Sequence, residues 1–165
     1  MFYLLLLLFL TKTSSLYCNN VYYENIQNID YMKYLGLWYE YSHSENFIFE
    51  NNCKCVTAEY TLDNNNIIVD NTCITNNYIS NIIGEAIIDS DIDGRLDVKF
   101  YKFQNYDPYD IVYLTKSYDV AVVLSCEYMW FLTRYKNPDI NLINDAISNV
   151  SNLIFNKQII TNLCN

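Results

Sequence analysis

The residue types that perform acid–base and nucleophilic catalysis are scarce in this sequence of 165 residues. It contains a single histidine, His43, so any Ser–His or Cys–His catalytic arrangement would have to use that side chain. The six cysteines form an even set, which favours structural disulfides over a reactive thiol. We therefore predict that this protein is not an enzyme.

One acidic segment, Asp89-Ser-Asp91-Ile-Asp93-Gly94, resembles the start of a calcium-binding EF-hand loop. That loop needs a bidentate acidic residue at its twelfth position, where this sequence has Phe100, and it needs a helix on each side. The flanking residues alternate as strands do. We therefore predict a solvated hairpin turn here and no calcium site.

The spacing of the cysteines does not favour a zinc site. Cys53 and Cys55 are separated by one residue, whereas paired zinc ligands are typically two to four residues apart, and no second pair or His cluster accompanies them. We therefore predict no metal site and expect the cysteines to form disulfides in an oxidising compartment. These residues alone do not decide which cysteines pair.

The N-terminal segment indicates that compartment. Phe2 to Leu10 is an unbroken apolar run, too short to span a bilayer but typical of a signal peptide, and small residues at Thr13 and Ser15 suit cleavage after Ser15. We predict a signal peptide over 1–15, a single domain over 16–165 and a secreted protein with no transmembrane segment. The formal net charge of −9 at pH 7 disfavours binding to nucleic acid, which needs a basic face, and we predict no nucleic-acid partner.

Short runs of alternating polar and apolar residues, separated by Asn, Asp and Gly, predict about eight β-strands. Strands at such short spacing favour an antiparallel barrel or sandwich. Asp63–Asn66 is expected to be a hairpin turn, because Asn tolerates positive φ. The predicted strands span 36–44, 56–62, 67–73, 79–88, 96–102, 109–115, 118–125 and 128–134.

After these strands the apolar period changes to that of a helix. Asn137-Pro138 predicts a helix start with Pro at the first helical position. We expect this helix to cover the outside of the sheet and Cys164 to tie the tail back to the body. Its predicted apolar stripe is Ile140, Ile143, Ile147, Val150 and Ile154.

Three segments in chain order resemble the signatures of the lipocalin family. Gly36-Leu37-Trp38-Tyr39-Glu40 resembles the first, Tyr118-Asp-Val-Ala-Val-Val123 the second and Met129-Trp-Phe-Leu-Thr-Arg134 the third. The segment from Cys55 to Asn71 is similar to the second and third strands of the apolipoprotein D and insect bilin-binding branch. The resemblance implies an all-β fold, an eight-stranded antiparallel up-and-down barrel with one C-terminal α-helix packed outside.

The resemblance also implies roles for individual residues. Trp38 is expected to lie across the closed end of the barrel with Arg134 over its ring, and with Gly36 it belongs to the structural signature of the family. The implied disulfides are Cys18–Cys126, Cys55–Cys164 and Cys53–Cys73. Because Cys73 lies close to both Cys53 and Cys55 in the predicted hairpin, Cys55–Cys73 with Cys53–Cys164 stays open as an alternative.

In such a barrel, alternation predicts which side chains face the interior, where one small ligand can be held. By parity with Trp38, Glu40 and Ser42 should point inward and His43 outward, exposed near the mouth. For 109–115 the two faces cannot be told apart. The predicted cavity residues are Glu40, Val56, Ala58, Tyr60, Val69, Ile82, Ala86, Val98, Phe100, Tyr113 and Trp130.

The predicted function is to carry or sequester a small hydrophobic ligand. The resemblance implies a linear tetrapyrrole such as biliverdin, or a lipid, and no obligatory cofactor. The alternative is an interaction protein whose barrel is a scaffold and whose loops 45–52 and 104–107 contact a protein partner. Asn149 lies in the only Asn-x-Ser/Thr motif and is a glycosylation acceptor if it faces water.

Overall fold

The computed structural model describes residues 16–18, 21–50, 52–161 and 164, and among residues 16–22 only the backbone. The predicted signal peptide, 1–15, lies outside the described residues, as does the side chain of Cys18. Among the described residues, no α-helix combines the length and the apolar character needed to cross a bilayer.

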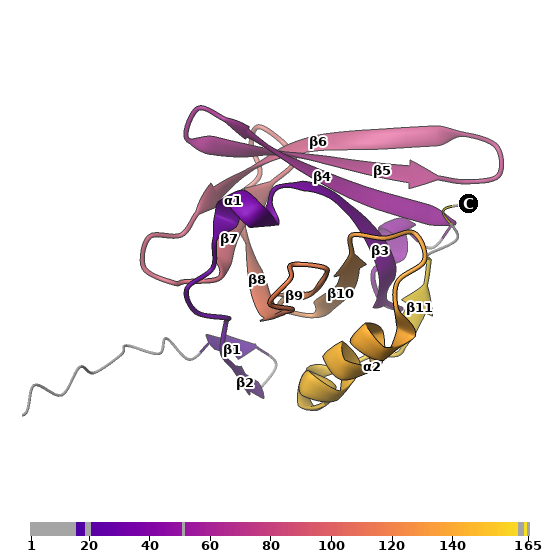
Figure 1. Ribbon diagram of the computed structural model, residues 1–165. Coiled ribbons are helices and arrows are strands. Elements are labelled where there is room, and N and C mark those ends of the chain that lie inside the picture. The colour runs from indigo at the N-terminus through magenta and orange to yellow at the C-terminus, as the bar shows by residue number, and fades with distance from the viewer. Residues whose placement is uncertain (1–15, 19–20, 51, 162–163, 165) are drawn as a thin grey trace, which may run out of the picture.

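Eight antiparallel strands form a closed barrel, which confirms the predicted fold class (Figure 1). Each strand pairs with the next one along the chain, and pairing of the last barrel strand with the first closes the ring. The barrel strands are β3 (Gly36–Ser44), β4 (Cys55–Asp63), β5 (Asn66–Ile74), β6 (Ile79–Ile88), β7 (Arg95–Lys99), β8 (Asp107–Leu114), β9 (Val120–Ser125) and β10 (Tyr128–Thr133).

The hairpin turns follow from local residue chemistry. Asn64 has a φ of 55°, the positive value that was expected for the β4–β5 turn. In the β6–β7 turn, the Asp89 carboxylate accepts hydrogen bonds from the backbone N–H groups of Asp91 and Ile92 at 2.7 and 2.9 Å. Asp89 therefore stabilises a turn between strands, as predicted for this acidic segment.

Smaller elements surround the barrel. β1 (Leu16–Cys18) and β2 (Val21–Tyr23) pair with each other, and the short helix α1 (Tyr31–Tyr34) precedes β3. A 3-10 turn, η1 (Ile48–Glu50), lies in the loop between β3 and β4. Late in the chain come α2 (Ile140–Asn149), the 3-10 turn η2 (Ser151–Leu153) and β11 (Gln158–Ile160), which pairs with the C-terminal part of β3.

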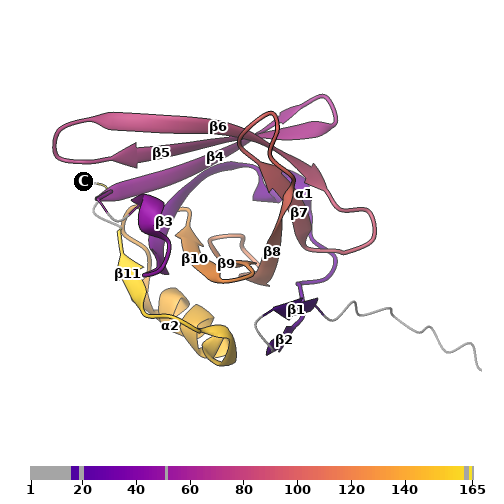
Figure 2. The same cartoon turned by 180° about the vertical axis from the view of Figure 1, so that it is seen from behind.

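The helix α2 packs on the outside of the barrel, as predicted, and both views show it there (Figures 1 and 2). Its start differs from the prediction: Asp139 is the N-cap and its carboxylate accepts from the Asn141 N–H at 2.9 Å, so Pro138 lies before the helix. Its buried face also differs, since Ile140 and Ile147 are exposed. The residues it buries are Ile143 and Ala146, followed by Val150 and Leu153.

Two apolar clusters lie on opposite sides of the barrel wall. The outer cluster joins α2 to β8, β9 and β10, through residues such as Ile143, Val122 and Phe131. The inner cluster fills the closed half of the barrel around Trp38 and Leu96.

Two disulfides are described, and both lie where β4 begins. Cys53 is bonded to Cys73 on β5, and Cys55 is bonded to Cys164 in the C-terminal tail. This is the pairing that the lipocalin resemblance implied, and the alternative pairing is wrong. Cys126 is also disulfide-bonded, but the Cys18 side chain predicted as its partner lies outside the described residues.

Candidate ligand-binding cavity

The open half of the barrel encloses a cavity of about 770 Å³. Its walls come from the inward side chains of β3 to β6, of β7 and β8, and of β10. The loop between β3 and β4 contributes Phe47, Phe49 and Glu50 at the rim. Aliphatic and aromatic side chains make up most of this surface, with a small number of amides and carboxyl groups among them.

The structure brings most of the predicted cavity residues together. Alternation identified those on β4, β5 and β6 because these are regular strands whose paired residues share one face. Predicted residues that line the cavity are Glu40, Val56, Ala58, Tyr60, Val69, Ile82, Val98, Phe100 and Trp130. Their contact with a ligand stays a prediction.

Two predicted cavity residues do not line it. Ala86 faces inward but is fully buried in the inner cluster, below the open space. Tyr113 faces outward and packs against the outer cluster. The cause is a β-bulge: Ile111 pairs with Val123 and Tyr113 with Val122, so Val112 is an extra residue that reverses the alternation of β8.

The predicted position of His43 is wrong because of a second bulge. Leu132 pairs with Glu40 and Phe131 with Ser42, so Tyr41 is an extra residue in β3. Beyond it the alternation reverses: Ser42 lies opposite the outward-facing Phe131, and His43 lies opposite Trp130 of the cavity wall. His43 is therefore fully buried and not exposed at the mouth.

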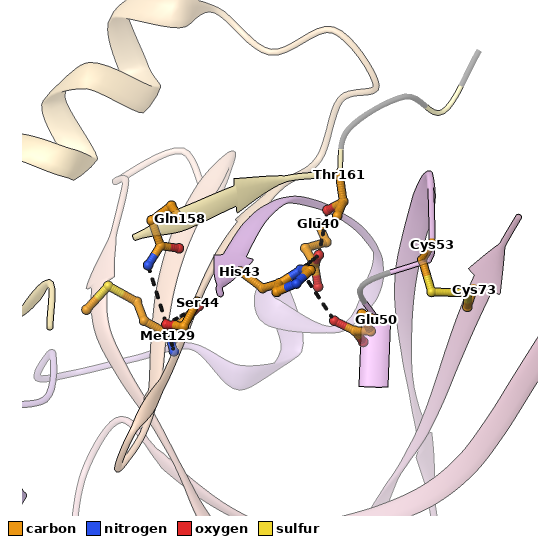
Figure 3. A network of polar contacts seen from close by, with 9 residues as sticks. All are labelled: Glu40, His43, Ser44, Glu50, Cys53, Cys73, Met129, Gln158 and Thr161. Carbon is orange, nitrogen blue, oxygen red and sulfur yellow. Dashed lines mark hydrogen bonds and ion pairs between the residues drawn. A yellow bond between two sulfur atoms is a disulfide. The ribbon is translucent and has the colours of Figure 1, made fainter. Parts of the chain in front are cut away.

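The buried His43 contacts two carboxyl groups (Figure 3). Its Nδ1 lies 2.8 Å from Glu40 Oε1, within hydrogen-bond distance, and 3.9 Å from Glu50 Oε2. The Thr161 hydroxyl donates a second hydrogen bond to Glu40 Oε1 at 2.5 Å. Burial raises the pKa of both carboxyl groups. The pKa of Glu50 rises to about 9, and the second cause of this rise is the nearby carboxyl group of Glu40.

Alternation within strands could not find the cavity residues that come from loops. Phe47, Phe49 and Glu50 lie in the segment that was predicted only as a mouth loop, and Gln104 and Asp107 lie in the other. Tyr109, which could not be assigned to a face, points into the cavity. The position of Phe47 depends on ring contacts with Tyr128 and Trp130, which are distant in the chain, so alternation around Phe47 could not predict it.

The sequence model of a protein family, the lipocalin-like domain, matches residues 29–158, and this match covers most of the chain. The chain belongs to the lipocalin family. Lipocalins bind small hydrophobic ligands and generally act as non-enzymatic carriers. This assignment agrees with the closed barrel, the outer helix and the cavity.

Similar proteins come from several animals. The lipocalin is 31% identical over 135 residues to the Lazarillo protein of Schistocerca americana, covering 71% of this chain but only 62% of that protein. It is 29% identical to apolipoprotein D of Bos taurus, covering 84% of this chain and 79% of that protein.

Solved structures share the fold at lower sequence identity. Insecticyanin from the tobacco hornworm Manduca sexta matches with a TM-score of 0.71 at 21% identity, over 88% of this chain and 85% of that chain. Lobster apocrustacyanin A1 matches with a TM-score of 0.65 at 17% identity, over 82% of this chain and 80% of that chain.

The closed end of the lipocalin barrel is built around Trp38 and Arg134. The guanidinium carbon of Arg134 lies 3.8 Å from the centre of the Trp38 ring, and the indole N–H donates to the Tyr34 carbonyl at 2.8 Å. Arg134 also donates to the carbonyls of Leu37 and Leu35 at 2.7 and 2.8 Å. These contacts tie the last strand to α1 and the start of β3, so they hold the barrel shut.

Three tyrosines lie between this closed end and the cavity. The Tyr109 hydroxyl is 2.8 Å from the hydroxyls of both Tyr34 and Tyr60. Burial raises the pKa of Tyr60 to about 12, and it raises the pKa of Tyr34 and Tyr109 as well. The network gives the floor of the cavity a few hydroxyl groups without a charge at neutral pH.

Alkaline titration should reveal this tyrosine network. An unfolded tyrosine ionises near pH 10, so a buried tyrosine with a higher pKa stabilises the fold below pH 10 and this contribution is lost as pH rises further. We expect a late phase of tyrosinate absorbance near pH 12 that coincides with unfolding. Tyr109→Phe should diminish this phase, and Tyr78→Phe, at an exposed position, should leave it unchanged. A single ionisation step near pH 10 would contradict the expectation.

Proposed function

We propose that this protein is a secreted lipocalin that carries or sequesters one small hydrophobic ligand in its barrel, either a linear tetrapyrrole such as biliverdin or a lipid. The observation that carries the proposal is the cavity of about 770 Å³, which lies within the range of about 300–1,000 Å³ typical of ligand pockets. Because the wall is largely apolar, a hydrophobic ligand is stabilised when it moves from water into the cavity.

Features of the cavity support a conjugated ligand that also carries hydrogen-bond donors. Tyr60, Phe100 and Trp130 present aromatic rings toward the cavity, and such rings stack on planar conjugated groups. The amide oxygen of Asn71 is buried in the wall and has no hydrogen-bond partner within the described part of the chain. It is positioned to accept from a ligand N–H, such as that of a pyrrole ring.

Secretion is part of the proposal because the predicted signal peptide and the disulfides agree on an oxidising compartment. We expect expression with the full N-terminus to yield medium that contains a protein starting at Leu16. Sequencing the N-terminus of that protein tests the predicted cleavage site, and retention of residues 1–15 would contradict it.

Ligand titration tests the carrier function. We expect biliverdin, retinol or a fatty acid to quench the intrinsic fluorescence of the protein and to bind with one molecule per barrel. Ala58→Phe adds a ring inside the cavity and should weaken binding about tenfold or more, an effect of about 1.4 kcal/mol. Thr57→Phe adds the same ring on the adjacent residue, which does not line the cavity, and serves as the control.

A second candidate function is favoured by apolar side chains exposed on the loops at the mouth. Ile48 and Phe49 on one loop and Tyr101 and Phe103 beside another are largely exposed, Phe103 to 96%. Such side chains are typical of surfaces that contact another macromolecule. A folded protein that fails to bind any of the three ligands, but is retained by a protein partner through these loops, would favour the scaffold function.

A further inference from the structure

Glu40, His43 and Glu50 form a compact group of nitrogen and oxygen donors in the cavity wall (Figure 3). One donor atom from each residue can be chosen so that all three lie within 4.8 Å of one another. The two measured distances from His43 Nδ1 are 2.8 Å to Glu40 and 3.9 Å to Glu50. In tetrahedral geometry, two ligand atoms that each lie about 2.0–2.2 Å from one zinc ion are about 3.4 Å apart. This separation lies between the two distances from His43 Nδ1.

The group combines two carboxyl groups with one imidazole, and all three side chains are largely buried. The side chains of His43, Glu40 and Glu50 are 0%, 3% and 14% exposed. Among the described residues, His43 is the only cationic partner within ion-pair distance of either carboxyl. Two carboxylates facing one imidazole in such a place need a proton or a cation between them. Glu50 Oε2 is itself buried and lacks a hydrogen-bond partner within the described residues.

The surrounding structure holds the three side chains in place before any ion binds. Glu40 and His43 reach the same side of β3 because of the bulge at Tyr41. The Glu50 carbonyl accepts from the Cys53 N–H at 2.8 Å, and Cys53 is bonded to Cys73. Thr161 donates to Glu40 from a tail that the bond between Cys164 and Cys55 fixes. Such outer contacts orient metal ligands in proteins.

We propose that Glu40, His43 and Glu50 bind a divalent transition-metal cation, with Zn²⁺ as the best match to one imidazole nitrogen and two carboxylate oxygens. Glu40 and Glu50 line the cavity, so a further coordination position would face the open space. The proposal goes beyond the carrier function and does not depend on it.

Titration of the oxidised, metal-stripped full-length protein with ZnCl₂ tests this proposal by calorimetry and by thermal unfolding. We expect one equivalent to bind and the melting temperature to rise, and Co²⁺ to give visible absorption bands of a bound ion. Glu50→Gln keeps the side-chain shape and removes one carboxylate ligand, so it should weaken Zn²⁺ binding at least about tenfold. Glu127→Gln, at an exposed rim position outside the group, is the matched control and should bind as the wild type does.

Any of three results would overturn the proposal: no saturable Zn²⁺ binding by the wild type, unchanged affinity in Glu50→Gln, or an equal loss in both variants. Glu50 lies on a short 3-10 turn at the rim, so its variant keeps the test valid if substitutions at the buried His43 prevent folding. Because the metal alone is the probe, a failure here leaves the result of the hydrophobic-ligand titration unaffected, and the reverse also holds.

Discussion

Replacing Trp38 with alanine is expected to lower the free energy of unfolding by about 3–5 kcal/mol, the usual cost of removing a large buried aromatic side chain. Trp38 is fully buried, and its removal would also leave the Arg134 guanidinium without the ring that it covers. The Tyr34 carbonyl would lose the indole donor. Urea denaturation followed by circular dichroism measures the loss.

The control is Trp130→Ala, since Trp130 is half-buried in the cavity wall at the other end of the barrel. We expect this variant to lose less stability and to change ligand affinity instead. A Trp38→Ala protein with native stability and altered ligand affinity would show that Trp38 acts on the ligand and not on the fold.

Replacing Asp110 with alanine is expected to cost about 3–5 kcal/mol of stability, as when one partner of a buried ion pair is removed. Asp110 is fully buried, and Arg95 donates to its two carboxylate oxygens at 2.7 and 2.8 Å. The Tyr23 hydroxyl and the Asn25 amide donate to the same carboxylate at 2.9 and 2.7 Å. The variant would therefore leave a cation and two polar groups without their acceptor.

This variant should also loosen the end of β2 and the segment that follows it, because Tyr23 and Asn25 are anchored to the barrel through Asp110. Chemical denaturation measures the overall loss, and amide exchange of residues 23–26 measures the local one. Asp107→Asn is the control, since Asp107 lies on the same strand but is exposed. If both variants were equally stable, the Asp110 network would contribute little to the fold.

Much of the fold could be predicted because it depends on local patterns. The alternation in β4 and β5 runs without interruption, so Ala58 and Val69 were placed on the cavity side from the sequence. The pairing of Trp38 with Arg134 was implied by the lipocalin resemblance and is present at 3.8 Å. Hairpin turns such as that at Asn64 follow from the conformational freedom of one residue type.

Two of the wrong positions, those of His43 and Tyr113, share one physical cause. A single extra residue, Tyr41 in β3 and Val112 in β8, reverses the face of every side chain beyond it. The prediction therefore turned His43 outward and Tyr113 inward, and in the structure each faces the opposite way. Nothing in the local sequence marks these bulges, because they are set by pairing with strands that are far away in the chain.

Asp110 was missed for a related reason. It follows the inward-facing Tyr109 on β8, so alternation places it on the outer face of the barrel, where an acidic residue ordinarily meets water. It is buried because Tyr23 and Asn25, more than eighty residues earlier in the chain, cover that face. Burial by such a distant segment leaves no trace in the sequence around Asp110.

The pairing of β11 with β3 has a consequence for the behaviour of the protein at high concentration. β4 pairs with β3 only as far as Tyr39, and β11 takes over the same side from Ser42 to Ser44, while β10 covers the other side. The terminal half of β3 thus presents no open hydrogen-bonding edge on which a neighbouring molecule could add a strand. For a chain this rich in Ile and Tyr, the short C-terminal strand is therefore a safeguard against aggregation.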